Sequence, residues 1–286
     1  IQAIEQDFRV SFIAPEAKIL VVDDVAMNRT VFKELLKKTR MQIFEAASGR
    51  ECLDMMSKQK FHMVFLDHMM PEMDGIETKH HIAEEGLGQG SPIIMLTANA
   101  ILEDREMYIE EGFDDFLSKP IIVSKLEEMI LKYLPEELIK EDASAEEIVQ
   151  EQEVVELPEL DEFDFGYAMN ILQKEELLYK FLEDFHYSLE PLGQKLDLLY
   201  AEIESEEGLS AYRTEVHALK STAATVGALL LSKTARLLEV AAIEKNVERI
   251  KVLHPVLMEE IKKHKERIAT LLQPKEPKPH AEKVEA

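Results

Sequence analysis

Five side chains in the first half of the chain could together bind and transfer a phosphoryl group. Each ends or follows a short apolar run: Asp23, Asp24, Asp67, Thr97 and Lys119. Three carboxylates at one place repel one another, and at least one pKa rises unless a cation joins them. Oxygen ligands without a nearby histidine favour Mg²⁺, a hard ion that keeps several waters. A carboxylate beside Mg²⁺, a hydroxyl and an ammonium suits phosphoryl chemistry, with the carboxylate as the attacking group.

A histidine in the second half of the chain could carry the same group. In the helical pattern of residues 209–226, His217 lies beside the apolar stripe, so we expect its ring on the exposed face of the helix. Arg213, Lys220 and Ser221 share that face at helical spacing. An imidazole nucleophile with a neighbouring cation suits phosphoryl transfer. The alternative is an ordinary solvated histidine on a helix surface.

Five apolar runs predict the strands of a buried parallel sheet. They cover residues 18–23, 41–46, 62–67, 92–97 and 114–118. Helical patterns separate these runs, so we expect a doubly wound α/β sheet of five parallel strands. Right-handed crossovers bring the polar strand ends to one edge, and we expect the strands that end in Asp23 and Asp67 to be neighbours.

The second half of the chain has no strand pattern and predicts a helical bundle. Helical periodicity covers residues 175–190, 194–205, 209–226, 229–244 and 247–272. Pro191, Gly208 and Gly227 are expected to separate these helices. Long helices joined by short turns favour an antiparallel four-helix bundle.

The length of 286 residues allows two domains at about 150 residues each. We expect the following division: an upstream remnant at 1–15, a first domain at 16–134, an acidic linker at 135–160, a second domain at 161–272 and a disordered tail at 273–286. Lys140 is the single basic residue of the linker, which is too charged to fold alone. A solvated helix over residues 136–149 is the alternative.

Composition excludes several classes of protein. The formal net charge of −24 argues against a nucleic-acid or anionic-membrane binder, because phosphate contacts need clustered Lys and Arg. Cys52 is the single cysteine, which excludes an intramolecular disulfide framework and predicts a small buried side chain. No apolar run approaches the ~20 residues of a membrane span. The chain begins with Ile1, so we expect it to be part of a longer protein.

Four runs, taken in order, resemble the motifs of response-regulator receiver domains over about residues 16–134. They are Val21-Val-Asp-Asp24, Asp67-His-Met-Met-Pro-Glu-Met-Asp-Gly75, Thr97-Ala-Asn99 and Lys119-Pro120. The resemblance implies a flavodoxin-like α/β fold and a cis peptide bond between Lys119 and Pro120. Val25 and His68 depart from the commonest pattern, and His68 leaves the lifetime of an acyl phosphate open.

The same resemblance implies a role for each matched side chain. Asp67 would accept the phosphoryl group, and Thr97 and Lys119 would contact its oxygens. Phe116 would be the aromatic residue that changes rotamer together with Thr97. Mg²⁺ would be held by the following groups: the carboxylates of Asp24 and Asp67, the main-chain carbonyl of Met69, and Asp23 through water.

The second domain is similar to histidine phosphotransfer (HPt) domains over about residues 160–272. The resemblance rests on His217-Ala-Leu-Lys-Ser-Thr-Ala-Ala-Thr-Val-Gly-Ala228 followed by Ala235-Arg-Leu-Leu-Glu239. It implies that His217 carries the phosphoryl group and that Lys220 assists. Ser221 stands where these domains usually have glycine. Its side chain would leave less room for a partner domain to approach the histidine.

The order of receiver, acidic linker and HPt domain looks like the carboxyl-terminal part of a hybrid sensor histidine kinase. The implied function is phosphorelay signal transduction, in which an upstream kinase core phosphorylates Asp67 and His217 passes the group to a downstream response regulator. The sequence has no kinase ATP-binding motif, so we expect no autophosphorylation. We expect a cytoplasmic location without direct contact to membrane or nucleic acid, although an N-terminal region of the parent could anchor it to a membrane.

Two alternatives use the same domains differently. In one, the receiver gates a helical docking module and the chain is a non-catalytic scaffold. The complete set of acidic, hydroxyl and ammonium groups argues against this interpretation, because a scaffold needs none of them. In the other, the receiver drains phosphoryl groups from His217 to water as a phosphatase sink.

Overall fold

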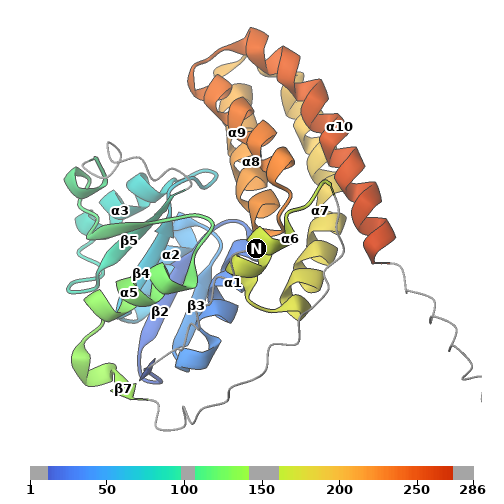
Figure 1. Cartoon of the computed structure of the whole chain (residues 1–286). Coiled ribbons are helices and arrows are strands. Elements are labelled where there is room, and N and C mark those ends of the chain that lie inside the picture. The colour runs from blue at the N-terminus through green and yellow to red at the C-terminus, as the bar shows by residue number, and fades with distance from the viewer. Residues whose placement is uncertain (1–11, 98–106, 142–160, 273–286) are drawn as a thin grey trace, which may run out of the picture.

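The computed structural model describes residues 12–97, 107–141 and 161–272, which form an α/β domain followed by a helical bundle (Figure 1). Three predicted segments therefore lie wholly or mostly outside the described residues: the upstream remnant at 1–15, the acidic linker at 135–160 and the tail at 273–286.

The sheet of the first domain has five parallel strands in the order β3-β2-β4-β5-β6. Their bounds are β2 (Lys18–Val22), β3 (Gln42–Ala46), β4 (Met63–Asp67), β5 (Ile93–Thr97) and β6 (Asp115–Ser118). The predicted fold class is confirmed, and each strand lies within its predicted run. Val22 pairs with Leu66, so β2 and β4 are neighbours and their carboxyl ends lie side by side.

Helices close both faces of this sheet, which is why its strands are apolar on both sides. One face is covered by α1 (Ala26–Leu35) and α5 (Val123–Tyr133), and the other by α2 (Gly49–Lys58) and α3 (Gly75–Glu84). Phe65 on β4 packs against Phe32 on α1, with ring centroids 4.8 Å apart. The next residue, Leu66, packs in the opposite cluster with Cys52, which is fully buried as predicted.

A short antiparallel ribbon joins the two ends of the first domain. β1 (Phe12–Ile13) pairs with β7 (Lys140–Glu141), and the 3₁₀ helix η2 (Glu136–Leu138) leads into β7. A second 3₁₀ helix, η1 (Lys37–Thr39), follows α1 and contacts β1. The first residues of the predicted linker thus belong to this ribbon, not to the alternative helix over 136–149.

Four long helices of the second domain form a closed ring of neighbours. They are α7 (Glu175–Tyr200), α8 (Glu206–Thr225), α9 (Leu229–Ile243) and α10 (Val247–Leu271), preceded by the short α6 (Phe165–Leu172). α7 contacts α8, α8 contacts α9, α9 contacts α10, and α10 contacts α7. Within the described ranges, no helix has an apolar stretch long enough to cross a lipid bilayer.

Side-chain caps explain where several helices begin. A serine, aspartate or asparagine before the first turn accepts a hydrogen bond from a main-chain N–H three residues later, which satisfies one of the free donors of the helix end. The capping residues are Ser48 for α2, Asp74 for α3, Asp164 for α6, Ser205 for α8 and Asn246 for α10.

The predictions that Pro191 and Gly208 separate helices are wrong, because α7 continues through Pro191 to Tyr200 and α8 begins at Glu206, before Gly208. A proline inside a helix removes the N–H that would bond to the carbonyl four residues earlier, here that of Tyr187. Tyr187 is 70 % exposed, so water can satisfy that carbonyl. Leu189 and Gly193 are buried, and their packing holds the helix together across the proline.

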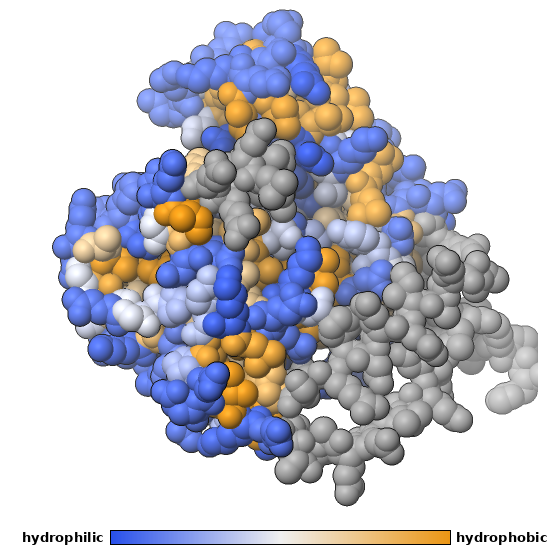
Figure 2. All heavy atoms as spheres, turned by 60° about the vertical axis from the view of Figure 1, so that its left-hand side comes forward, coloured by the Kyte–Doolittle hydropathy of each residue, from blue (hydrophilic) through white to orange (hydrophobic). Residues whose placement is uncertain are grey.

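Polar side chains cover most of the surface seen in Figure 2, with apolar side chains gathered in smaller patches. This distribution agrees with the strongly acidic composition of the chain.

We predict that Gly227→Ala destabilises the bundle by about 2–3 kcal/mol, because two penalties act together. Gly227 has a φ of 81°, and a Cβ at this position would lie 2.3 Å from the main-chain oxygen of Asp164. Urea unfolding measures the loss. Gly90→Ala is the matched control, since Gly90 has a φ of 80° but a Cβ there would have no atom within 4 Å. The control should lose only about 1 kcal/mol; equal losses would show that the close contact has no effect.

Candidate functional site

Three carboxylates converge at the carboxyl edge of the sheet. One carboxylate oxygen from each of Asp23, Asp24 and Asp67 lies within 4.8 Å of the others. Asp23 and Asp67 are 1 % exposed, whereas Asp24 is half-buried. The main-chain N–H of Val25 donates to Asp23 Oδ1 at 2.9 Å, and the Asn28 amide donates to both oxygens of this carboxylate. The predicted acidic cluster is therefore formed, with Asp23 fixed in place.

Lys119 joins two of these carboxylates. Its Nζ lies 2.6 Å from Asp23 Oδ2 and 2.6 Å from Asp67 Oδ1. The side chain is only 4 % exposed, and its own main-chain N–H donates to the carbonyl of Thr97 at 2.7 Å. The peptide bond between Lys119 and Pro120 is cis, as the resemblance implied.

Gly75 allows the loop after β4 to close tightly beside Asp67. Its N–H donates to the main-chain oxygen of His68 at 2.8 Å. A Cβ at residue 75 would lie 2.3 Å from the main-chain oxygen of Asp67. The glycine that follows the helix cap Asp74 is therefore required by close packing, and it keeps this loop against the carboxylates.

Burial and mutual repulsion destabilise the ionised carboxyl groups. Burial raises the pKa of Asp24 to about 6, and the charge of Asp23 adds to this effect. Burial also raises the pKa of Asp67, which the ammonium of Lys119 only partly opposes. Burial alone would lower the pKa of Lys119, but the carboxylates of Asp23 and Asp67 raise it above its usual range. One ammonium does not offset the clustered carboxylates, so the site favours a further cation.

These donors fit Mg²⁺. All three side chains offer carboxylate oxygens, which hard divalent cations prefer, and their oxygens are close enough to share one ion. A bound divalent cation would favour the ionised forms of Asp24 and Asp67 and so lower the pKa of both. Met69 lies in the loop that follows Asp67, where its carbonyl could complete the predicted ligand set.

Thr97 and Phe116 are connected through a residue that the sequence did not single out. Tyr108 is 1 % exposed and donates a hydrogen bond to Thr97 Oγ1 at 3.0 Å. The same hydroxyl lies 3.2 Å from Nδ1 of His68. The rings of Tyr108 and Phe116 are 6.3 Å apart. Tyr108, which was not predicted, therefore lies between the hydroxyl of Thr97 and the ring of Phe116. The predicted motif residues 98 and 99 lie outside the described residues.

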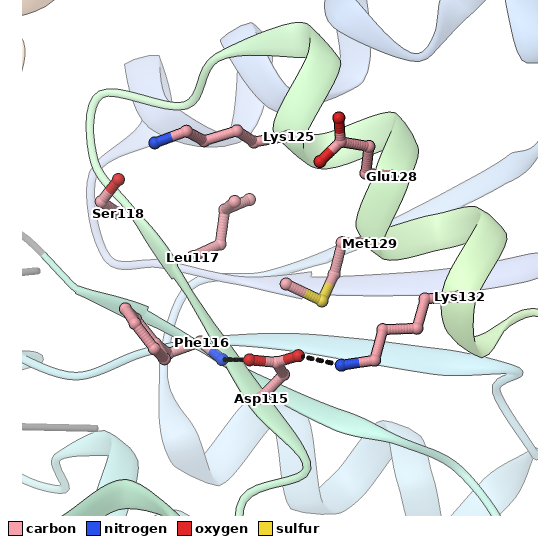
Figure 3. Close-up of a pocket in the computed structure, with 8 residues that line it drawn as sticks. All are labelled: Asp115, Phe116, Leu117, Ser118, Lys125, Glu128, Met129 and Lys132. Carbon is pink, nitrogen blue, oxygen red and sulfur yellow. Dashed lines mark hydrogen bonds and ion pairs between the residues drawn. The ribbon is translucent and has the colours of Figure 1, made fainter. Parts of the chain in front are cut away.

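A separate groove runs between β6 and α5 (Figure 3). Lys132 reaches from α5 to the carboxylate of Asp115 on β6, at 2.7 Å. Phe116 lines this groove, and none of the three clustered carboxylates does. The groove is therefore distinct from the acidic site and shares with it only the strand that carries Phe116.

His217 lies in α8, but its expected exposed position is wrong, because the ring is only 5 % exposed. Its Nδ1 lies 2.5 Å from Oε1 of Glu239 on α9. The other oxygen of Glu239 accepts a hydrogen bond from Lys220 at 2.5 Å. Glu239 thus joins the two predicted residues of this site. It was part of the sequence motif, but nothing in its spacing assigned it a role.

The protonation states in this cluster follow from burial and the Glu239 contacts. Burial lowers the pKa of His217 to about 4, so the ring is neutral at pH 7. Burial would raise the pKa of Glu239, but hydrogen bonding to His217 and the charge of Lys220 lower it to about 2. A carboxylate accepts only, so the proton of the neutral ring is on Nδ1. Nε2 then carries the lone pair and is free of any hydrogen-bond partner among the described residues.

The acidic site and the histidine cluster lie close together. Nη2 of Arg213, one turn before His217, contacts Sδ of Met69 at 3.7 Å. Burial lowers the pKa of both His217 and Lys220, and the charge of Lys119 adds to both shifts. One buried hydrophobic cluster also contains residues of both domains. The structure therefore brings together the two groups of residues that the sequence identified separately.

Comparison with known proteins assigns the first domain. Residues 19–131 match the family model of the response regulator receiver domain. The aerobic respiration control sensor protein ArcB of Escherichia coli is 28 % identical over 151 residues, which are 52 % of this chain and 19 % of ArcB. The sensor histidine kinase RcsC of Salmonella typhi is 35 % identical over 115 residues, which are 40 % of this chain and 12 % of RcsC. The chain thus spans less than a fifth of these relatives.

Among solved structures, the chemotaxis protein CheY4 of Vibrio cholerae is 29 % identical, with a TM-score of 0.39. The match covers 41 % of this chain and 98 % of CheY4.

We predict that Asp24→Asn raises the melting temperature of the metal-free protein by a few degrees at pH 8. The folded state raises the pKa of Asp24 to about 6 from 3.8, so ionisation costs stability as pH rises through this range. The advantage of the variant should disappear near pH 4, where both forms are neutral. Added MgCl₂ should stabilise the variant less than the parent chain.

Thermal unfolding with and without MgCl₂ tests this prediction. Asp54→Asn, at a position whose side chain is 58 % exposed, controls for the loss of one negative charge. If MgCl₂ raises the melting temperature of Asp24→Asn as much as that of the parent chain, Asp24 is not a Mg²⁺ ligand.

We also predict that ¹⁵N NMR finds His217 neutral from pH 5 to 8, with the proton on Nδ1. Glu239→Gln should move the two ring nitrogen shifts towards each other, because a neutral amide holds the Nδ1 proton less firmly than a carboxylate. Glu244→Gln, at the end of the same helix, is the control. A ring that gains a proton near pH 6.5 in the parent chain would contradict the assignment.

Proposed function

Since residues 19–131 form a response regulator receiver domain, we propose that this chain is a phosphorelay intermediate. It accepts a phosphoryl group on Asp67 and passes that group to His217 of a histidine phosphotransfer domain at residues 161–272. A histidine kinase core upstream supplies the group, and a separate response regulator receives it. The observation that carries the proposal is the placement of the His217 cluster against the acidic edge, through Arg213 and Met69.

Entry of the phosphoryl group depends on the acidic edge. A carboxylate oxygen of Asp67 attacks the phosphorus atom of the donor, and the bond from phosphorus to the donor nitrogen or oxygen breaks. Lys119, already 2.6 Å from Asp67, can turn its ammonium towards the phosphoryl oxygens. Thr97 lies at the end of the strand next to β4 and offers a hydroxyl to the same oxygens. Bound Mg²⁺ would neutralise charge on the phosphoryl oxygens.

Transfer to the bundle depends on the protonation of His217. The Nε2 lone pair forms a bond to phosphorus as the bond from phosphorus to Asp67 breaks, and Asp67 recovers its carboxylate. The ring then carries a phosphoryl group on Nε2 and a proton on Nδ1, so it becomes positively charged. Glu239, 2.5 Å from Nδ1, stabilises this charge and keeps the ring oriented. Lys220, held by the other oxygen of Glu239, lies next to the phosphorylated ring.

The relatives support the place of this chain in a relay. ArcB and RcsC are named as sensor proteins, and RcsC as a histidine kinase. The matched part is less than a fifth of either relative. We therefore propose, from the resemblance alone, a kinase core in the same parent chain and a cytoplasmic position. The complete acidic site favours phosphoryl transfer over a non-catalytic scaffold, because buried carboxylates that repel one another cost stability and a scaffold does not need all of them.

We predict that acetyl phosphate and MgCl₂ label the chain at two positions. The Asp67 label is labile in base, whereas the His217 label survives base and is lost in acid. Asp67→Asn should reduce both labels to background, because the first carboxylate is the entry point. His217→Gln should keep the base-labile label and lose the other. Labelling followed by a phosphate-affinity gel, after acid or base treatment, measures both.

Asp54→Asn and His186→Gln are matched controls, because both positions lie outside the two clusters. Full labelling of Asp67→Asn would contradict entry at Asp67. An unlabelled parent chain would favour the scaffold, and rapid loss of the Asp67 label to water without a histidine label would favour the phosphatase sink.

A further inference from the structure

Arg213 links the two clusters, and among the described residues most of its hydrogen-bonding capacity is unused. Its Nη2 contacts only a weak acceptor, the sulfur of Met69, at 3.7 Å. Its Nε is buried and has no hydrogen-bond partner among the described residues. An arginine is always charged and normally pairs with an anion when its donors are buried. The contact therefore leaves a cation whose guanidinium can still bind an anion.

The guanidinium donors of Arg213 lie near both Asp67 and His217, between which the phosphoryl group would be transferred. Arg213 lies four residues before His217 on α8, so the two side chains project from the same face of the helix. Met69, which Arg213 contacts, is two residues after Asp67. One guanidinium therefore lies beside the nucleophile of the bundle and beside the loop that carries the acceptor of the receiver.

Other polar atoms on this face are buried without partners as well. Nε2 of His217 and Oγ of Ser221 have none among the residues that the structure describes. Arg213, His217 and Ser221 follow one another at intervals of four residues and form one stripe along α8. Arg213 and Ser221 can donate hydrogen bonds, and His217 between them has a free lone pair. This arrangement fits a phosphoryl group that is bonded to His217 and accepts hydrogen bonds from its neighbours.

The surrounding charges favour an anion at this place. In the receiver, Lys119 lies 2.6 Å from Asp67, and in the bundle Lys220 shares the carboxylate of Glu239 with His217. Burial lowers the pKa of Lys220, and the charges of Arg236 and Lys119 add to this effect, so a negative group beside Lys220 would relieve the repulsion. Glu215 is close enough to Asp24 to help raise the pKa of that carboxyl, so one side of the contact remains acidic.

We propose that Arg213 donates hydrogen bonds to the phosphoryl group as it passes from Asp67 to His217 within one chain. This inference rests on the proposed function. It adds Arg213 to the residues that act in the transfer and names the receiver of the same chain as the donor. During transfer, negative charge spreads over the three oxygens that are not exchanged. Arg213 keeps all its protons and donates to these oxygens, while the phosphorus bond moves from Asp67 to Nε2 of His217. Because the contact is made with this chain's own receiver, Arg213 also selects that receiver as the donor.

A single-turnover experiment on the full chain tests this role. Asp67 is labelled from radioactive acetyl phosphate with MgCl₂, the donor is removed, and the conversion of base-labile to base-stable label is followed. Arg213→Ala should slow this conversion by about 10²-fold. Enzymes lose about this much rate when one hydrogen-bond donor to an oxygen that gains negative charge in the transition state is removed. Arg213→Lys should restore part of the rate, because it keeps the charge but loses the planar fork. Arg249→Ala, on an exposed part of α10, is the control.

Two further readouts separate this role from a structural one. Labelling of Asp67 in the double variant Arg213→Ala, His217→Gln should equal that of His217→Gln, because Arg213 does not act on entry. The conversion rate in the parent chain should not change on dilution, because donor and acceptor are in one molecule.

The outcomes are distinguishable. If the parent chain shows no base-stable label at all, the proposed function and this inference both fail. If the parent chain transfers and Arg213→Ala transfers equally fast, only the role of Arg213 fails. If conversion slows on dilution, the donor is the receiver of another molecule, and the contact between Arg213 and Met69 is not the transfer geometry.

Discussion

Burial of like charges at one edge of a sheet is the constraint on which the rest of this structure depends. Asp23 and Asp67 occupy neighbouring strand ends because β2 and β4 are paired, and no rotamer choice can separate them far. Lys119, directly after β6, offsets part of their repulsion. The remaining repulsion favours further cations at this edge, and Arg213 of the bundle contacts Met69 in the loop beside it.

Much of the receiver could be predicted from sequence because its signals are local. Unbroken apolar runs indicate strands buried on both faces, and a polar residue at the end of each run marks the edge where the strands meet. Asp23, Asp67 and Thr97 were found in this way, and the sheet topology then brought them together. The bundle was predictable as a bundle, since helical periodicity and short turns are also local features.

The remaining features depend on contacts between segments distant in sequence. His217 has the spacing of an exposed residue on α8, and it is buried only because other elements cover that face. Glu239 is one glutamate among many on a helix surface until α8 and α9 pack together. Tyr108 was missed for the same reason, since its hydroxyl meets Thr97 through the fold. Pro191 predicted a helix end that does not occur, because tertiary packing on both sides of the proline outweighs its local helix-breaking effect.

The ribbon of β1 and β7 has a consequence for how this molecule exchanges partners. It pairs residues just before and just after the receiver, so both chain connections leave the domain from one place. That place is next to the amino end of β2, whereas the carboxylates lie at its carboxyl end, about five residues or ~17 Å away. The ribbon and the reactive edge therefore lie at opposite ends of the sheet. Successive proteins or domains can dock at the carboxylates and leave again without disturbing the pairing of β1 with β7.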